Sequence, residues 1–141
     1  MDANELASRV ARGMLAAEGT GPAWGIRIEE ARAGYARLAM AVRTDMLNGH
    51  GIVHGGMVFA LADTAFAYVC NGGNEKTVAA QASIVFLGSA NEGDTLIAEG
   101  EAVAAAGRSG VTRVTVRCPD GRPIAEFTGY SRTLGGAVVE V

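Results

Sequence analysis

The sequence has too few cysteines to build a disulfide framework or a thiolate metal centre. Its 141 residues include only two, Cys70 and Cys118, with no Cys-x-x-Cys pair, and we expect both to be small buried thiols. His50 and His54 have the spacing of a metal pair on a helix, but the glycines around them argue against a helix there. We therefore expect neither a metal nor a cofactor.

Long apolar runs and a large excess of one charge are also absent. The 12 Lys and Arg against 15 Asp and Glu leave a net charge of −3 without a basic stripe, which disfavours nucleic acid as a partner. The longest apolar run, 57–70, is too short for a comfortable membrane span and contains Asp63. Residues 1–17 lack the long apolar core of a signal peptide. The sequence thus predicts a cytoplasmic protein without a membrane partner.

The composition supports a folded core. Hydrophobic residues make up 49% of the chain and charged residues 19%, which disfavours disorder. No repeat, linker or low-complexity segment interrupts the sequence. We expect one domain that spans residues 1–141.

Two segments have the pattern of helices. Apolar residues recur at helical spacing over 5–17, with Asn4 as the expected N-cap and glycine and proline at 19–22 ending the helix. A longer helix is predicted over 56–71, where nearly every residue is apolar. The glycine-rich stretch 48–56 precedes it as a loop.

Alternation of apolar and polar residues predicts strands in the rest of the chain. The predicted strands cover 26–29, 35–43, 78–87, 95–105, 111–117 and 124–132. Short turns between them favour antiparallel pairing. A helix that is apolar all round needs cover on every side, which one curved sheet wrapped around it would supply. We therefore expect an α+β protein whose exposed sheet edge pairs with a second copy.

Asp63 is the most unusual residue of the long helix. An ionised carboxylate without partners is costly to bury. It could bind a neighbouring loop and only specify packing, or face water through a gap in the sheet. The functional interpretation is a general base or nucleophile beside an apolar cleft, with a pKa that desolvation raises towards the working pH.

The triplet His54-Gly55-Gly56 stands where this helix begins. The first N–H groups of a helix have no internal partner and carry the positive end of the dipole. Aimed at a carbonyl, they would form an oxyanion hole. The alternative is a tight turn needed for packing alone.

Gly55 and Asp63 are too far apart to act on one carbonyl carbon within one chain. Eight residues of helix separate them by about 12 Å along the axis. Either they have separate roles, or they meet across a subunit interface. We favour the second option, in which a two-fold axis creates two equivalent sites.

These residues resemble a known family. Asn48, the triplet 54–56 and the segment 61–67 (Leu-Ala-Asp-Thr-Ala-Phe-Ala) are similar to hotdog-fold thioesterases of the PaaI type, which act in phenylacetate degradation and related acyl-CoA metabolism. The match is close over 46–71. It is looser at Phe86-Leu87, 93–96 and 134–136.

The resemblance implies a hotdog fold and a thioester hydrolase, in which an aromatic, hydroxyphenylacetyl-type CoA thioester yields the free acid and CoA. It also implies a homotetramer made of two dimers with shared sites. Asp63 would be the catalytic carboxylate. The Gly55 N–H of the partner subunit would hold the carbonyl oxygen, Asn48 would help polarise it, and His54 would support the loop.

Four further residues are predicted to contact the substrate on the same basis: Gly56, Thr64, Arg108 and Ser109. Thr64, or Ser83 in its place, would supply a hydroxyl that holds the water. Arg108 and Ser109 lie on a turn that in this family is near the nucleotide part of coenzyme A, where an arginine suits phosphate. An ordinary solvated turn is the alternative.

Two other functions stay open. One is a hotdog hydratase or dehydratase of enoyl or 3-hydroxyacyl thioesters, with His54 and Asp63 as the acid–base pair. The other is a protein that binds acyl-CoA without chemistry. The sequence also leaves open the acyl group, the choice of dimer or tetramer, and the choice between activated water and a covalent anhydride at Asp63.

Overall fold

The computed structural model describes all residues from 1 to 141. Its six strands form one antiparallel sheet in the order β1-β2-β4-β5-β6-β3. The strands are β1 (Arg27–Arg32), β2 (Tyr35–Ala41), β3 (Thr77–Phe86), β4 (Thr95–Ala106), β5 (Ser109–Arg117) and β6 (Pro123–Thr133). The helices are α1 (Ala3–Ala17), α2 (Thr20–Trp24), the 3-10 turn η1 (Thr44–Met46) and α3 (Gly55–Cys70). None of the helices is long and apolar enough to cross a bilayer.

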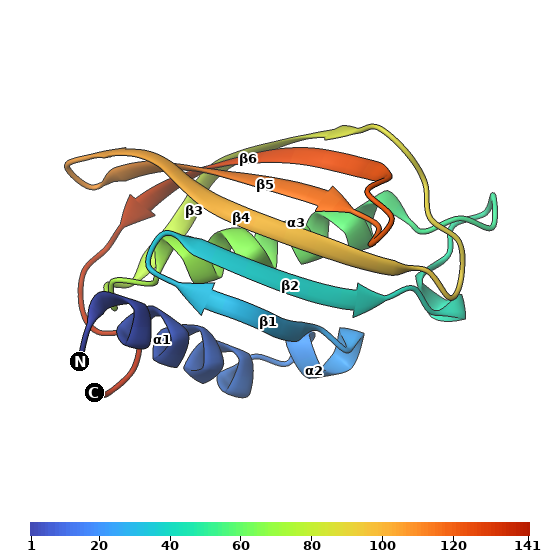
Figure 1. The fold of residues 1–141 in the computed structure, drawn as a ribbon. Helices are drawn as coiled ribbons and strands as arrows, with labels where there is room; N and C mark the ends of the chain where they lie inside the picture. Colours follow the sequence, from blue (N-terminus) through green and yellow to red (C-terminus); the bar gives the residue numbers. More distant parts are fainter.

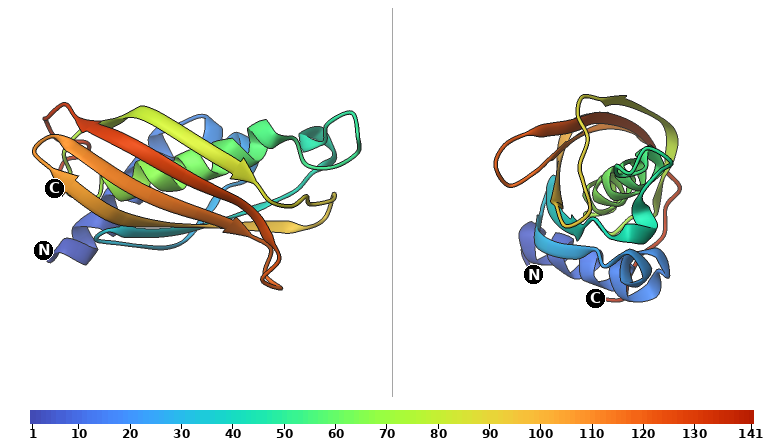
Figure 2. Two further views of the ribbon diagram at one scale, coloured as in Figure 1. Left: turned by 90° about the horizontal axis from the view of Figure 1, so that it is seen from above. Right: turned by 90° about the vertical axis from the view of Figure 1, so that its right-hand side faces the viewer.

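The sheet curls around α3, as the sequence predicts (Figures 1 and 2). Seen along the helix axis, α3 lies inside the curve, and α1 packs outside it against β1. The α+β architecture with one central helix is thus confirmed. We call the face of the sheet that meets α3 the inner face.

The start of α1 differs from the prediction. The N-cap is Asp2 rather than Asn4, because Asp2 and Glu5 form a reciprocal capping box. Asn4 instead accepts a hydrogen bond from the Ala33 N–H at 3.1 Å, which ties α1 to the turn between β1 and β2. The predicted end of α1 at Ala17 is confirmed.

The short helix α2 was not predicted. The glycines and Pro22 were expected only to end α1. Instead, Glu18 caps the end of α1, Gly19 caps the start of α2, and α2 begins at Thr20. Pro22 lies in the first turn of α2, where its missing N–H costs no helical hydrogen bond. Gly25 then closes α2 in the left-handed conformation, with φ of 68°.

Two glycines let α3 lie close to the inner face. A side chain at Gly129 of β6 would come within 2.6 Å of the Phe66 ring, and one at Gly100 of β4 within 3.0 Å of Val69. Phe66 also contacts Phe127 with ring centroids 5.8 Å apart. At these two positions the α3 side chains therefore pack directly against the strand backbone.

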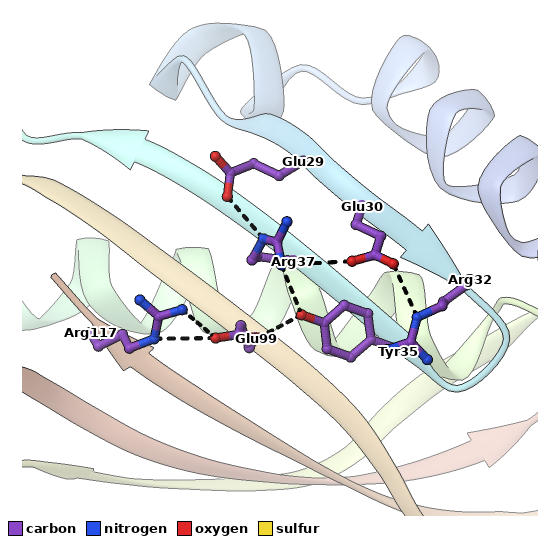
Figure 3. Close-up of polar contacts among 7 residues, drawn as sticks. All are labelled: Glu29, Glu30, Arg32, Tyr35, Arg37, Glu99 and Arg117. Atoms are coloured by element: carbon purple, nitrogen blue, oxygen red, sulfur yellow. Dashed lines mark hydrogen bonds and ion pairs between the residues drawn. The ribbon is translucent and has the colours of Figure 1, made fainter. Parts of the chain in front are cut away.

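The outer face of the sheet carries a network of charged side chains (Figure 3). Glu99 of β4 accepts hydrogen bonds from the Tyr35 hydroxyl of β2 and from Arg117 of β5, both at 2.5 Å. These bonds, that from Tyr35 first, lower the pKa of the Glu99 carboxyl below its usual range. Arg37 joins the network to Glu29 of β1 at 3.1 Å. The network links four strands on the face away from α3.

The two edges of the sheet differ. Helix α1 packs against the β1 edge, whereas the β3 edge has no covering element within the chain. Val85 and Phe86 near the end of β3 are 60% and 52% exposed. An apolar edge strand with free backbone groups is a surface for pairing with another strand.

Candidate active site

His54 caps the start of α3 with its side chain. Its Nδ1 accepts a hydrogen bond from the Gly56 N–H at 2.8 Å. A side chain at position 56 would lie 3.0 Å from this nitrogen, so glycine leaves room for the ring to fold back onto the helix. The predicted support of this loop by His54 therefore has a definite form, which is an N-cap.

The Gly55 N–H is the one amide of the first helical turn without a partner. Gly56 donates to the His54 ring, and Met57 and Val58 both donate to the His54 carbonyl, at 2.9 Å and 3.3 Å. The Gly55 N–H donates no hydrogen bond within the chain. A free amide at the positive end of a helix can stabilise an oxyanion.

Asn48 organises the loop that leads to this amide. Its Oδ1 accepts from the His50 N–H at 2.8 Å and from the Ile52 N–H at 3.4 Å. The Asn48 N–H in turn donates to the Ile52 carbonyl at 2.8 Å. Since these bonds use only the side-chain oxygen, the Asn48 side-chain NH₂ keeps its donors free.

Asp63 lies two turns further along α3 and is half-buried. Its carboxylate accepts no hydrogen bond from the chain, so the contact with a neighbouring loop that would make it structural is not formed. Burial alone raises the pKa of this carboxyl above its ordinary value. On the helix it shares a stripe with small, incompletely buried residues, among them Ala60 and Ala67.

The two hydroxyl candidates are both directed elsewhere. Thr64 is buried and donates its hydroxyl proton to the Ala60 carbonyl at 2.7 Å. Ser83 pairs with Thr128, between Ala82 and Ile84, whose side chains face α3. Since side chains alternate along a strand, Ser83 points to the outer face. Within one chain neither hydroxyl group is directed at the Asp63 carboxylate.

Arg108 and Ser109 lie at the other end of the molecule from Gly55. Arg108 lies in the turn between β4 and β5, and Ser109 is the first residue of β5. This turn lies beyond the C-terminal end of α3 (Figure 1). A cavity of about 480 Å³ is lined there by Ser109, Tyr130 and Arg132, among others. Asp63 does not line it. Within a single chain, Arg108 and Ser109 are therefore far from the start of α3.

Sequence reasoning missed one residue that packs against the start of α3. The Phe86 ring, at the end of β3, lies against Gly55, with its atoms 3.1, 3.3 and 3.6 Å from where a Cβ of residue 55 would be. These residues are far apart in the sequence, so only the pairing of β3 with β6 reveals the contact. The Phe86 ring therefore occupies the space beside Gly55 that a larger side chain would need.

Comparison with known proteins identifies the family. Residues 50–125 match the model of the thioesterase superfamily. The chain is 39% identical to the acyl-coenzyme A thioesterase PaaI of Escherichia coli K12, over 82% of this chain and 83% of that protein. The solved structure of the E. coli PaaI protein from the phenylacetic acid degradation operon matches with a TM-score of 0.94 and 35% identity, covering 96% and 99% of the two chains.

A further solved relative has coenzyme A in its crystal structure. It is a hypothetical thioesterase protein of Streptococcus pneumoniae TIGR4 with coenzyme A, which is 28% identical with a TM-score of 0.77 and covers 79% of this chain and 90% of that one. The match over more than half of the chain, the identity to a curated thioesterase and the common fold agree. The chain belongs to the thioesterase superfamily and is a thioester hydrolase of the PaaI type with the hotdog fold.

Proposed function

We propose that the protein hydrolyses acyl-CoA thioesters, with an aromatic, hydroxyphenylacetyl-type acyl group as its substrate class. The free Gly55 N–H at the start of α3 carries this proposal, because it is the donor that thioester hydrolysis needs for its oxyanion. The acyl-CoA activity of the E. coli relative and the operon of its gene support the choice of substrate.

In the proposed reaction the thioester carbonyl oxygen accepts a hydrogen bond from the Gly55 N–H. Negative charge develops on this oxygen as the carbon becomes tetrahedral, and the positive end of the α3 dipole favours that charge. The free NH₂ of Asn48 provides a second donor to the same oxygen. Gly56 contributes space for the His54 cap rather than its amide, which is already bonded.

Asp63 is proposed as the group that activates water. Its carboxylate takes a proton from water while the water oxygen attacks the carbonyl carbon. The tetrahedral intermediate then breaks its carbon–sulfur bond, and the leaving thiolate of CoA takes up the proton. Direct attack by Asp63, giving an anhydride that water hydrolyses, uses the same residue as nucleophile. The absence of a protein partner leaves this carboxylate available for either route.

The site is proposed to be shared between two subunits. Eight residues of helix place Asp63 about 12 Å from the Gly55 of its own chain, which is too far for both to reach one carbonyl group. Pairing of two β3 edges around a two-fold axis would set the start of one α3 beside the middle of the other. The association of two such dimers into a tetramer stays a prediction.

Two predicted contacts with coenzyme A also depend on this dimer. We infer that Arg108 and Ser109 bind the nucleotide part of a substrate molecule. The thioester group of that molecule would lie at the start of α3 in the partner subunit. Arg108 is exposed and forms no ion pair within the chain, so its guanidinium is free to bind phosphate. Thr64 stays a predicted contact through its hydroxyl oxygen only.

The tautomer of His54 favours hydrolysis over the hydratase reaction. A hydratase base needs a histidine nitrogen with a free lone pair. Nδ1 of His54 already accepts the Gly56 N–H, so in the neutral ring the proton is on Nε2, which can then only donate. The ring can hold an oxygen or sulfur acceptor but is unsuited to abstract a proton.

Replacing Gly55 by proline tests the oxyanion hole directly. Gly55 is the first helical residue, where proline removes the N–H without breaking a helical bond, and His54 has the extended backbone that a residue before proline prefers. Gly55→Ala is the matched variant, since it adds the same Cβ beside Phe86 but keeps the N–H. We expect kcat of the proline variant to be about 10²–10³-fold below that of the alanine variant.

The reaction itself is tested by following thiol release from a panel of acyl-CoA thioesters. Release that favours arylacetyl over short alkyl thioesters supports the substrate class. Equal kcat for Gly55→Pro and Gly55→Ala would contradict the role of the amide. No thiol release from any thioester by the wild-type protein, with binding retained, would instead favour an acyl-CoA-binding protein.

A further inference from the structure

Phe86 holds a fixed place over the start of α3. It is the last residue of β3 and pairs with the buried Ala125, on the inner face of the sheet. The chain is anchored directly after it, where the Leu87 and Gly88 N–H groups donate to the Ile124 carbonyl at 2.8 Å and 3.2 Å. These hydrogen bonds hold the backbone at the end of β3 in place.

One side of the Phe86 ring packs on Gly55, and much of the ring remains uncovered. Its nearest atom would be 3.1 Å from a Cβ at position 55, yet the residue is 52% exposed. An inward-facing aromatic ring that its own chain leaves open can still bury area against a ligand. It is also adjacent to the one free amide of the helix start.

We propose that Phe86 determines substrate specificity by forming the wall of the acyl pocket next to the Gly55 amide. An acyl group whose carbonyl oxygen is held by Gly55 would extend along this ring. A flat aromatic acyl group packs against the ring with more contact than a short alkyl chain does. The ring also keeps water away from the amide, which strengthens its hydrogen bond to the carbonyl oxygen. The inference rests on the proposed acyl-CoA thioesterase function.

The test compares two substrates in variants of Phe86. The measured quantity is kcat/KM for phenylacetyl-CoA divided by kcat/KM for butyryl-CoA. We expect Phe86→Ala to lower this ratio by about three- to tenfold, which corresponds to the contribution of a contact between two aromatic rings. Phe86→Leu keeps an apolar side chain and should give an intermediate ratio. Val103→Ala is the control, because Val103 is an exposed valine of β4, three strands away from the β3 edge, and its ratio should stay that of the wild type.

A double variant tests the contact between Phe86 and Gly55. Gly55→Ala places a methyl group against the ring and should displace it, so this variant also lowers the ratio of the two substrates. In the Phe86→Ala background the ring is gone, and the added methyl should change the ratio little further. Such non-additivity marks two residues that act through one contact.

The outcomes separate this inference from the proposed function. Wild-type protein that hydrolyses both thioesters, with an unchanged ratio in Phe86→Ala and Phe86→Leu, would overturn the role of Phe86 alone. Additive effects of the Gly55 and Phe86 variants on the ratio would overturn the shared contact. Wild-type protein that hydrolyses neither thioester would instead remove the proposed function on which the inference rests.

Discussion

At the scale of single residues, Asp63 and Asp94 show how their surroundings set the character of two carboxylates. Burial without a partner raises the pKa of Asp63. Hydrogen bonds from the Asn91 N–H, which has the largest effect, and from Arg122 hold the pKa of the Asp94 carboxyl below its ordinary range. Asp94 is thus stabilised in its charged form by the fold, whereas the charge of Asp63 costs stability in the folded chain.

We therefore expect Asp63→Asn to abolish most of the activity while raising the melting temperature near neutral pH. Between the unfolded and the raised folded pKa the native state binds more protons, so stability falls as pH rises through that window. Above the window the whole cost of the charge is present, and asparagine removes it. Thermal melts over a pH series should show a gain at neutral pH that disappears below the unfolded pKa.

Asp94→Asn serves as the control with the opposite sign. A lowered folded pKa contributes stability that is present above the unfolded pKa and is lost as pH falls through the folded value. Asp94→Asn should therefore lower the melting temperature near neutral pH. A lower melting temperature for Asp63→Asn as well would show that the Asp63 carboxylate has a stabilising partner, against its proposed role.

Local sequence patterns predict some of the candidate site residues. A lone carboxylate in an apolar helix marks Asp63, and two glycines at a helix start mark the free amide. Phe86 could not be found in this way, because its contact with Gly55 depends on strand register. Asp2 was missed as the cap of α1 because two capping residues lie close together, and only the reciprocal bond to Glu5 distinguishes them from each other.

At the scale of elements, the start of α3 depends on the His54 cap. Asparagine is a favoured N-cap residue whose side-chain oxygen can replace Nδ1, whereas alanine offers no acceptor. His54→Ala should lower the free energy of unfolding by about 0.5–2 kcal/mol, and His54→Asn should lower it by less. Urea denaturation measures both. Equal losses for the two variants would mean that the ring matters for packing rather than for capping.

The contact of α3 with the sheet depends equally on a missing side chain. A methyl group at Gly129 would lie 2.6 Å from two atoms of the buried Phe66 ring, so Gly129→Ala forces helix and strand apart. We expect this substitution to lower the free energy of unfolding by about 1–3 kcal/mol. Gly73→Ala is the control, because no atom lies within 4 Å of the added methyl group. Similar urea midpoints for the two variants would contradict this close packing.

At the scale of the whole molecule, the sequence predicts the sheet around α3 but not every element that closes it. Period-two alternation and the apolar length of α3 are strong signals. Helix α2 has too few residues for a periodic pattern and contains Pro22, so it could not be distinguished from a loop. The exposed β3 edge follows from the architecture, since a sheet that curls without closing leaves an end unpaired.

Mixing two inactive variants tests the shared site most directly. Asp63→Asn and Gly55→Pro chains, unfolded together in equal amounts and refolded, would form hybrids in half of the dimers. Each hybrid has one intact site, because the wild-type Asp63 of one chain meets the wild-type Gly55 of the other. A shared site therefore predicts recovery of about one quarter of wild-type activity. Activity no greater than that of the two variants refolded separately, with hybrids confirmed by native mass spectrometry, would contradict it.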